Sequence, residues 1–201
     1  MNLNKFIQQD MEIWNNINLI KVLQDGGVAV MPTDTIYGIV GQALKKNAVE
    51  RIYAVRKRNP NKPCIILISD VEELKKFSID LTTEQEDILK SKWDATQANF
   101  RSTSIILDCM DEEFEYFHRG TNTLAFRLPV QVELRELILQ TGPLIAPSAN
   151  TEGGTPSVNI EDAKKYFGDS VDLYIDGGEI KSKASRVIRL NKDGTINTLR
   201  E

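Results

Sequence analysis

The stretch from Met31 to Gly38 reads MPTDTIYG and follows directly on an apolar run, GVAV. Proline has no amide hydrogen and cannot donate to a central sheet ladder, so Pro32 is expected to end a strand that starts at Val28. Residues 33–35 then carry three small oxygen-bearing side chains where the chain leaves the sheet. Ligands favour the carboxyl ends of strands in open α/β sheets, so the stretch predicts a ligand site there.

A plain polar turn, stabilised by an Asx hydrogen bond from Asp34, explains the same letters equally well. Gly38 and Gly41 favour the ligand interpretation, because a residue without Cβ lets the backbone approach a bound molecule closely. The residues of this stretch alone leave both interpretations open.

Apolar residues elsewhere alternate between helical and strand spacing, which predicts an α/β domain with a mixed sheet flanked by helices. Helices are expected at residues 17–25, 47–58, 70–77, 83–93, 131–140 and 159–167. Strands are expected at 28–31, 64–68, 103–108, 123–128, 143–146 and 171–176, followed by a hairpin around NKDG. Asn47 is the expected N-cap of the second helix, and Thr83 with Glu86 has the spacing of a capping box. The domain is expected to span 17–201, after an N-terminal extension of residues 1–16.

The composition bounds the class of protein. With 201 residues, 41% of them hydrophobic, the chain can bury one core, and its apolar runs stay below the ~18 residues that span a membrane. Its N-terminus does not resemble a signal peptide, and Cys64 and Cys109 lie in apolar runs, as the reduced thiols of a cytoplasmic protein do. The one histidine, His118, and the lack of a C-x-x-C pair argue against a zinc site, and no Ser-His-Asp order supports a catalytic histidine. A net charge of -4 means that nucleic acid would need a local basic patch.

Four cations lie within seven residues near the end of the second expected helix, in RKRNPNK at 56–62. A solvated basic helix end, favoured by the helix dipole, is one explanation. The other is an anion clamp, in which the guanidinium forks of Arg56 and Arg58 bind phosphates together with Lys62, turned back by the Asn-Pro turn.

A Gly- and Ser-rich loop, APSANTEGGTPS, occupies residues 146–157 after an apolar run. Its backbone amides could cradle a phosphate, and a flexible connection explains the letters as well. The sequence has neither G-x-x-x-x-G-K-[ST] nor G-x-G-x-x-G, so neither a Walker A site nor a Rossmann dinucleotide site is supported.

Arg127 stands in an apolar strand, TLAFRLP, on the face opposite Leu124, Phe126 and Leu128. A buried arginine is costly unless it is paired. Arg127 is therefore expected to meet either an internal carboxylate, such as that of Asp34, or an anionic ligand.

Five segments, in order along the chain, resemble the YrdC/Sua5 family. They are PTDTIYGIVGQAL, RKRNPNKP, TLAFRLP, PSAN and the terminal ASRVIRL…TLR. The resemblance implies a twisted mixed sheet with a concave, positively lined cavity, the YrdC-like fold. It also implies L-threonylcarbamoyladenylate synthesis, in which ATP, bicarbonate and L-threonine give threonylcarbamoyl-AMP and pyrophosphate. That product would serve the formation of N6-threonylcarbamoyladenosine in tRNA.

Residue by residue, the resemblance implies catalytic roles for Arg58 and Lys62. The implied ATP contacts come from Arg56, Arg58, Lys62, Thr123, Ser148, Asn150, Ser157 and Arg200. The implied L-threonine contacts come from Thr35, Arg127, Ala146 and Ser185. Mg²⁺ would be held mainly by ATP phosphates and water, without a metal site built from side chains. Further partners would be tRNA or double-stranded RNA and the threonylcarbamoyl-transferase proteins that receive the product; no membrane partner is expected.

The chain departs from the family pattern at several places. Arg56 replaces a lysine, Ala146 replaces a threonine or serine, and Arg186 follows Ser185 where a threonine is usual. The segment 93–104 lacks the proline and glycine of a Trp-Pro-Gly-Pro element. Three alternatives stay open: an RNA-binding or ribosome-maturation protein with the same cavity, a paralogue that makes a carbamoyl-adenylate for another acceptor, and an α/β domain without catalysis.

Overall fold

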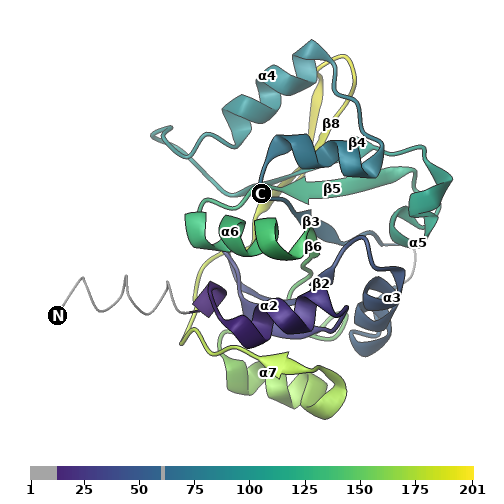
Figure 1. Ribbon diagram of the computed structural model, residues 1–201. Helices are drawn as coiled ribbons and strands as arrows, with labels where there is room; N and C mark the ends of the chain where they lie inside the picture. The colour runs from purple at the N-terminus through teal and green to yellow at the C-terminus, as the bar shows by residue number, and fades with distance from the viewer. Residues whose placement is uncertain (1–12, 60–61) are drawn as a thin grey trace.

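The computed structural model describes residues 13–59 and 62–201, which form one large sheet flanked by helices (Figure 1). In this described part of the chain the sheet has nine strands in the order β7-β1-β2-β6-β3-β5-β4-β8-β9. The strands are β1 Ala29–Pro32, β2 Tyr37–Gln42, β3 Ile65–Leu67, β4 Thr103–Asp108, β5 Thr123–Arg127, β6 Leu144–Ile145, β7 Leu173–Tyr174, β8 Arg186–Leu190 and β9 Ile196–Arg200. The pairs β1–β7, β3–β5 and β4–β8 are parallel and the others antiparallel, so the predicted mixed sheet is confirmed.

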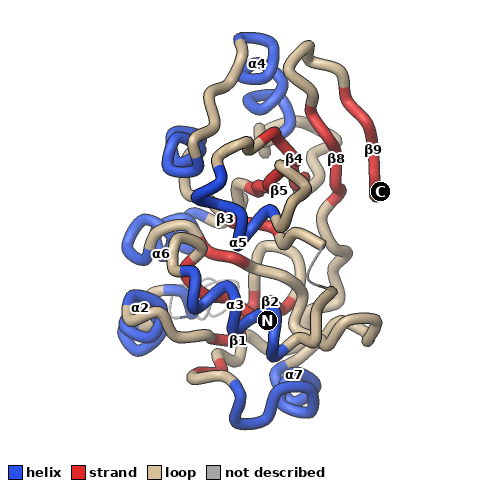
Figure 2. The backbone as a smooth tube through the Cα atoms, turned by 90° about the vertical axis from the view of Figure 1, so that its right-hand side faces the viewer, coloured by secondary structure: helices blue, strands red, loops and turns tan. Residues whose placement is uncertain are grey.

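Helices connect the strands and cover the sheet. The α-helices are α2 Ile17–Gln24, α3 Lys46–Val55, α4 Thr83–Lys92, α5 Glu115–His118, α6 Val132–Thr141 and α7 Ile160–Phe167. The 3-10 helices are η1 Val71–Phe77, η2 Glu112–Phe114 and η3 Gly168–Ser170. Figure 2 shows α4 and α7 at opposite ends of the molecule, and β8 and β9 side by side along one edge.

Two helices begin at residues other than those expected. α3 starts after Lys45, which makes no side-chain cap bond, so the prediction of Asn47 as its N-cap is wrong. The capping box of α4 is formed by Thr82 and Gln85 rather than by Thr83 and its partner three residues on. Thr82 and Thr83 both fit the sequence pattern. The box forms at Thr82, because the side chain of Gln85 reaches back to the amide of Thr82.

The MPTDTIYG stretch is a tight hairpin turn into β2, a strand that the sequence pattern did not reveal. Pro32 ends β1 as expected, and it pairs with Tyr37 at the start of the antiparallel β2. The amide of Thr33 donates to the carbonyl of Ile36 at 3.2 Å and closes the turn. Gly41 lies within β2, where an added Cβ would stand 3.2 Å from a side-chain carbon of α3. Gly41 therefore serves helix packing, and its role in ligand approach stays a prediction.

The two faces of the sheet are covered unequally. α2 and α6 lie side by side over β1, β2 and β6 (Figure 1), where Leu19 of α2 and Leu137 of α6 share one apolar cluster with Met31. On the opposite face, α3, η1, α5 and α7 supply the side chains of a larger apolar cluster. Leu124 and Phe126 of β5 point into that larger cluster, as their strand spacing predicts.

Beyond α2 and α6, the same face of the sheet continues without a covering helix among the residues that the structure describes. Ile65 of β3 and Ile106 of β4 both pair with Ala125 of β5, so their side chains share that face. Ile65, Ile106 and the neighbouring Val187 of β8 are only partly buried. This uncovered stretch of sheet forms the floor of the site.

Residues at the start of the described chain pack under the same face. Ile13 and Trp14 are buried, and Trp14 Nε1 donates to the carbonyl of Pro32 at 3.0 Å. Of the expected extension 1–16, residues 1–12 lie outside the described residues. Cys64 and Cys109 are buried free thiols. No helix in the described ranges combines the length and the apolar character that crossing a bilayer requires.

Candidate active site

Two adjoining cavities open on the uncovered face of the sheet. The small cavity has a volume of about 130 Å³ and the large cavity about 370 Å³. They share Ile65, Pro147, Ser148 and Arg200, which therefore form the boundary between them. Ser148 is held at this boundary by a β-bridge to Gly38 of β2.

Arg127 lines the small cavity from the end of β5 and is paired with an internal carboxylate. Its Nη2 lies 2.7 Å from Asp34 Oδ1, and its Nε donates to the same oxygen at 3.0 Å. The side chain of Asp34 is 0% exposed, that of Arg127 is 4% exposed, and Ser102 Oγ donates to Asp34 Oδ2 at 3.1 Å. The sequence predicted either an internal carboxylate or an anionic ligand as the partner of Arg127. The structure contains the internal carboxylate, that of Asp34. Because these bonds use Nε and Nη2, Nη1 is the nitrogen that a ligand would meet.

Thr33 and Thr35 shape the turn that carries Asp34. Thr33 Oγ1 donates to the carbonyl of Ile36 at 2.7 Å and accepts from the amide of Thr35 at 3.3 Å. Both threonines are buried and line the small cavity. The carboxylate of Asp34 bonds to Arg127 and a serine of another segment, so the Asx-turn alternative is not what forms. The stretch turns its oxygens into a cavity instead of exposing them to solvent.

Arg200 and Ser185 form another wall of the small cavity. Arg200 Nε and Nη2 donate to the carbonyl of Ser185 at 3.0 and 2.8 Å, and Ser185 Oγ lies 2.8 Å from Ser104 Oγ. Burial, and then the neighbouring charge of Arg127, lowers the pKa of the Arg200 guanidinium. Two guanidinium groups therefore repel each other at this cavity, and a bound anion would relieve that repulsion.

The loop at 146–157 is built around Arg56, whose side chain is 2% exposed. Arg56 Nε donates to the carbonyls of Ser148 and Asn150, both at 2.9 Å. Asn150 Nδ2 donates to two further carbonyls of the loop, and Ser157 Oγ donates to another. The described residues that line the small and large cavities do not include Arg56, Asn150 or Ser157. They hold the loop in shape, and their contacts with ATP stay a prediction.

Some of the backbone amides of this loop donate to carbonyls of the protein. The N–H groups that donate to backbone carbonyls are those of Ala146, Ala149, Asn150, Glu152, Gly154 and Ser157. The expected phosphate cradle of loop amides stays a prediction, and Ser148, whose amide is not one of these donors, lines both cavities.

Cations and one carboxylate meet beside the large cavity. Arg58 and Lys62 line this cavity; Arg58 Nη1 and Lys62 Nζ each lie 3.2 Å from an oxygen of Glu152. Partial burial of Glu152 opposes its ionisation, but the hydrogen bond from Lys62 and the charge of Arg58 outweigh burial and lower the pKa of the carboxyl. The cation cluster expected from RKRNPNK is present, with an internal anion bound in it.

The large cavity joins apolar and cationic surfaces. Its apolar lining includes Ile65, Ile106, Ala125, Val187 and Leu199. Its polar lining includes the hydroxyls of Thr121, Thr123 and Ser148 and the cations Arg58, Lys62 and Arg200. In the described chain, neither cavity is lined by a carboxylate. An apolar floor suits a flat ring and the cations suit phosphates, so the large cavity can hold a nucleotide.

The structure brings most of the predicted site residues together. Those predicted to bind L-threonine, namely Thr35, Arg127, Ala146 and Ser185, all line the small cavity. Those predicted to bind ATP that line the large cavity are Arg58, Lys62, Thr123, Ser148 and Arg200. Sequence reasoning missed Glu152, although a single carboxylate in a predicted phosphate loop was a usable signal. It also missed Ser102 and Ser104, which lie beside β5 and carry no local signal.

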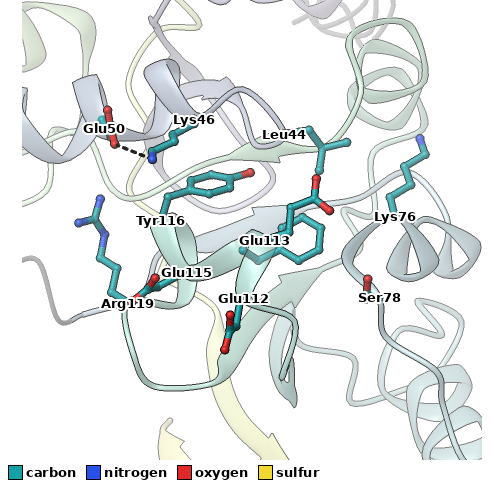
Figure 3. Close-up of a pocket in the computed structure, with 11 residues that line it drawn as sticks. Leu44, Lys46, Glu50, Lys76, Ser78, Glu112, Glu113, Glu115, Tyr116 and Arg119 are labelled. Carbon is teal, nitrogen blue, oxygen red and sulfur yellow. Dashed lines mark ion pairs between the residues drawn. The ribbon is translucent and has the colours of Figure 1, made fainter.

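A larger depression of about 900 Å³ lies elsewhere, beside α3, η1 and the η2–α5 segment. Figure 3 shows side chains of both charges around it, including the pair Lys46–Glu50 at 3.9 Å. Lys76 and Arg119 stand among three glutamates of η2 and α5, so the field has no dominant sign. None of the predicted site residues lines this depression, and we place the candidate active site at the small and large cavities.

No group of three metal-binding side chains comes together within the described ranges. A divalent cation fits the large cavity as a phosphate-bound ion, because the lining cations would repel a bare one. His118 is buried, its Nδ1 accepts from the amide of Gly120 at 3.2 Å, and it lines neither cavity.

Comparison with known proteins places this chain in one protein family. Residues 21–201 match the model of the Sua5/YciO/YrdC family, described as "Telomere recombination". A threonylcarbamoyl-AMP synthase of Pyrococcus abyssi is 27% identical over 176 residues, which are 87% of this chain and 50% of that protein. The crystal structure of P. abyssi Sua5 complexed with L-threonine has a TM-score of 0.74 at 28% identity, covering 86% of this chain and 50% of that one. Escherichia coli YciO has a TM-score of 0.77 at 25% identity, covering 95% of this chain and 89% of that one. The chain thus spans about half the length of the P. abyssi relatives.

Proposed function

This chain belongs to the Sua5/YciO/YrdC family, and from that premise we propose that it is an L-threonylcarbamoyladenylate synthase. It would condense L-threonine, bicarbonate and ATP to threonylcarbamoyl-AMP and pyrophosphate. The observation that carries the proposal is the pair of adjoining cationic cavities, one of amino-acid size and one of nucleotide size, that share Ser148 and Arg200.

The small cavity is the proposed L-threonine site. Its volume of about 130 Å³ is below the roughly 300–1,000 Å³ typical of drug-sized ligands. The carboxylate of threonine would meet Nη1 of Arg127 and relieve the repulsion between that guanidinium and Arg200. The hydroxyls of Thr35 and Ser185 would orient the polar groups of the amino acid, and Ala146 would contact its methyl group.

The large cavity is the proposed ATP site, with the base on the apolar floor and the phosphates at Arg58 and Lys62. Thr123 and Arg127 lie on one face of β5, four residues apart, which corresponds to roughly 13 Å at about 3.3 Å per residue. That separation lets a nucleoside contact Thr123 while its α-phosphate lies near Ser148, next to the amino acid. The shared boundary would bring the two substrates head to head.

The chemistry that this arrangement supports is positioning and charge neutralisation. The amine of threonine attacks bicarbonate and gives a carbamate with loss of water. A carbamate oxygen then attacks the α-phosphorus, and the bond from that phosphorus to the bridging oxygen breaks as pyrophosphate leaves. Both reactants are anions, so Arg127, Arg200, Arg58 and Lys62 would offset their repulsion in the transition state. When bound with ATP, Mg²⁺ supplies further charge neutralisation at the phosphates.

A pyrophosphate-release assay tests the proposal. Purified protein is incubated with Mg-ATP, L-threonine and bicarbonate, and each substrate is omitted in turn. Pyrophosphate is expected only with all three substrates, together with a product that has the mass of threonylcarbamoyl-AMP. Release that does not depend on threonine, or no release with the complete mixture, would refute the synthase assignment.

The unstable adenylate would pass to a threonylcarbamoyl-transferase that modifies tRNA. None of the three alternatives left by the sequence gains a supporting observation from the structure. Direct RNA binding would weaken steeply as the salt concentration rises, which gives a simple measurement that separates it from synthesis of a small molecule.

A further inference from the structure

A carboxylate occupies the cation cluster where the phosphates of a nucleotide would bind. Glu152 Oε2 lies 3.2 Å from Arg58 Nη1, and Glu152 Oε1 lies 3.2 Å from Lys62 Nζ. Arg56 Nη1 is buried without a hydrogen-bond partner in the described structure and lies 3.9 Å from Glu152 Oε2. One negative charge thus faces three positive charges, and the cluster keeps a positive excess for a more highly charged anion.

Three of the five N–H donors of Arg58 are bonded within the protein, and one of these, at Nη1, faces Glu152. Arg58 Nε donates to the carbonyl of Lys62 at 3.0 Å, and Arg58 Nη2 donates to the carbonyl of Pro63 at 2.8 Å. These two bonds hold the chain that follows α3 against the guanidinium, so the group cannot rotate without breaking them. A phosphate that binds Arg58 therefore meets the terminal nitrogens beside the carboxylate and competes with it at Nη1.

The backbone of Glu152 is held in place, whereas its side chain can move away from the cations. Its amide donates to the carbonyl of Arg56 at 2.9 Å, and the following turn is closed by a bond from Gly154 N to Thr151 O at 3.0 Å. Its side chain is 30% exposed and Lys62 is 64% exposed, so the carboxylate can swing into water without burying a charge.

We propose that Glu152 is an internal counter-anion that competes with a polyphosphate for Arg58 and Lys62, and that this exchange sets the affinity and selectivity of the nucleotide site. A polyphosphate carries several negative charges and gains by the exchange, whereas a nucleoside monophosphate exchanges one phosphate for one carboxylate with little gain. When pyrophosphate leaves, Glu152 returns to the cations and hinders rebinding. The identity of the nucleotide rests on the proposed function, but the exchange concerns any polyphosphate and the free protein.

Calorimetric titration of the free protein with inorganic pyrophosphate, Mg-ATP and AMP, without threonine or bicarbonate, tests the exchange. Glu152→Gln removes the charge and keeps the size of the side chain. Glu161→Gln is the matched control, because it removes an exposed glutamate that pairs only with Lys164 on α7 in the described structure. The Kd for pyrophosphate and for ATP is expected to fall roughly 3- to 10-fold in Glu152→Gln, the range for losing two partly exposed competing ion pairs. In the Glu161→Gln control the Kd for pyrophosphate and for ATP should change little. In Glu152→Gln the Kd for AMP should also change little.

Several outcomes would overturn the inference. Unchanged or weaker pyrophosphate binding in Glu152→Gln would reject it, and weakening confined to buffers with Mg²⁺ would make Glu152 a metal ligand instead. Equal tightening in the control would reduce the effect to net charge. Glu152→Ala provides a second variant that should also tighten binding, with circular dichroism to check that both variants fold. If no threonylcarbamoyl-AMP forms but Glu152→Gln binds pyrophosphate more tightly, the proposed function fails and this inference stands.

Discussion

Replacing Asp34 by asparagine tests the buried ion pair on which the small cavity depends. At the observed 2.7 Å, the attraction between Asp34 and Arg127 is about 6 kcal/mol at an effective dielectric constant of about 20. Loss of hydration offsets much of this attraction, but Asp34→Asn leaves a cation buried without its counter-charge, which costs about 3–5 kcal/mol. Urea-induced unfolding at pH 7 should show a loss of that size in the free energy of unfolding.

A double-mutant cycle separates the ion pair from general damage. Arg127→Met should cost about as much as Asp34→Asn, and the double variant should cost at least about 2 kcal/mol less than the sum, because neither buried charge then stays unpaired. The control is Asp172→Asn at the Arg51–Asp172 pair, whose side chains are 37% and 39% exposed; there the expected loss is below about 1 kcal/mol. Additivity within about 0.5 kcal/mol at Asp34 and Arg127 would refute the reasoning.

Three further predictions concern phosphate binding by Arg58, the loop at 146–157 and the loss of stability at low pH. Arg58→Ala should raise the Kd for ATP by about 10- to 100-fold, as loss of a charge-assisted hydrogen bond does, while circular dichroism shows a folded protein; unchanged affinity in calorimetry would reject the clamp. Arg56→Lys should lower the free energy of unfolding by about 2–4 kcal/mol and weaken both substrates, because lysine lacks the fork that holds Ser148; a stable variant with normal affinities would contradict this. A hydrogen bond from Arg51 lowers the pKa of the Asp172 carboxyl, so its contribution is present above the unfolded pKa and lost as the pH falls through the folded one. Urea unfolding of Arg51→Met between about pH 4 and pH 2 should therefore show a flatter pH dependence than the parent protein, and equal slopes would count against the pair.

The sequence by itself was enough for the class of fold and for the two faces of β5. In β5, alternate positions place Leu124 and Phe126 in the apolar core and Ala125 and Arg127 at the cavities. This works because the side-chain period of a strand is a local property, visible in a few consecutive letters. Burying an unpaired arginine is costly in any protein, and this rule correctly predicted a partner for Arg127.

The tertiary structure alone decided which polar residues face a cavity and which support it. Arg56 and Arg58 are two letters apart in one basic run, yet one guanidinium holds the loop at 146–157 and the other reaches the large cavity. Likewise, β2 was hidden by its glycines, and it is a strand because β1 and β6 supply its partners. Glu152 meets Arg58 across more than ninety residues of chain. Contacts of that separation depend on how elements pack, and no local pattern of letters encodes them.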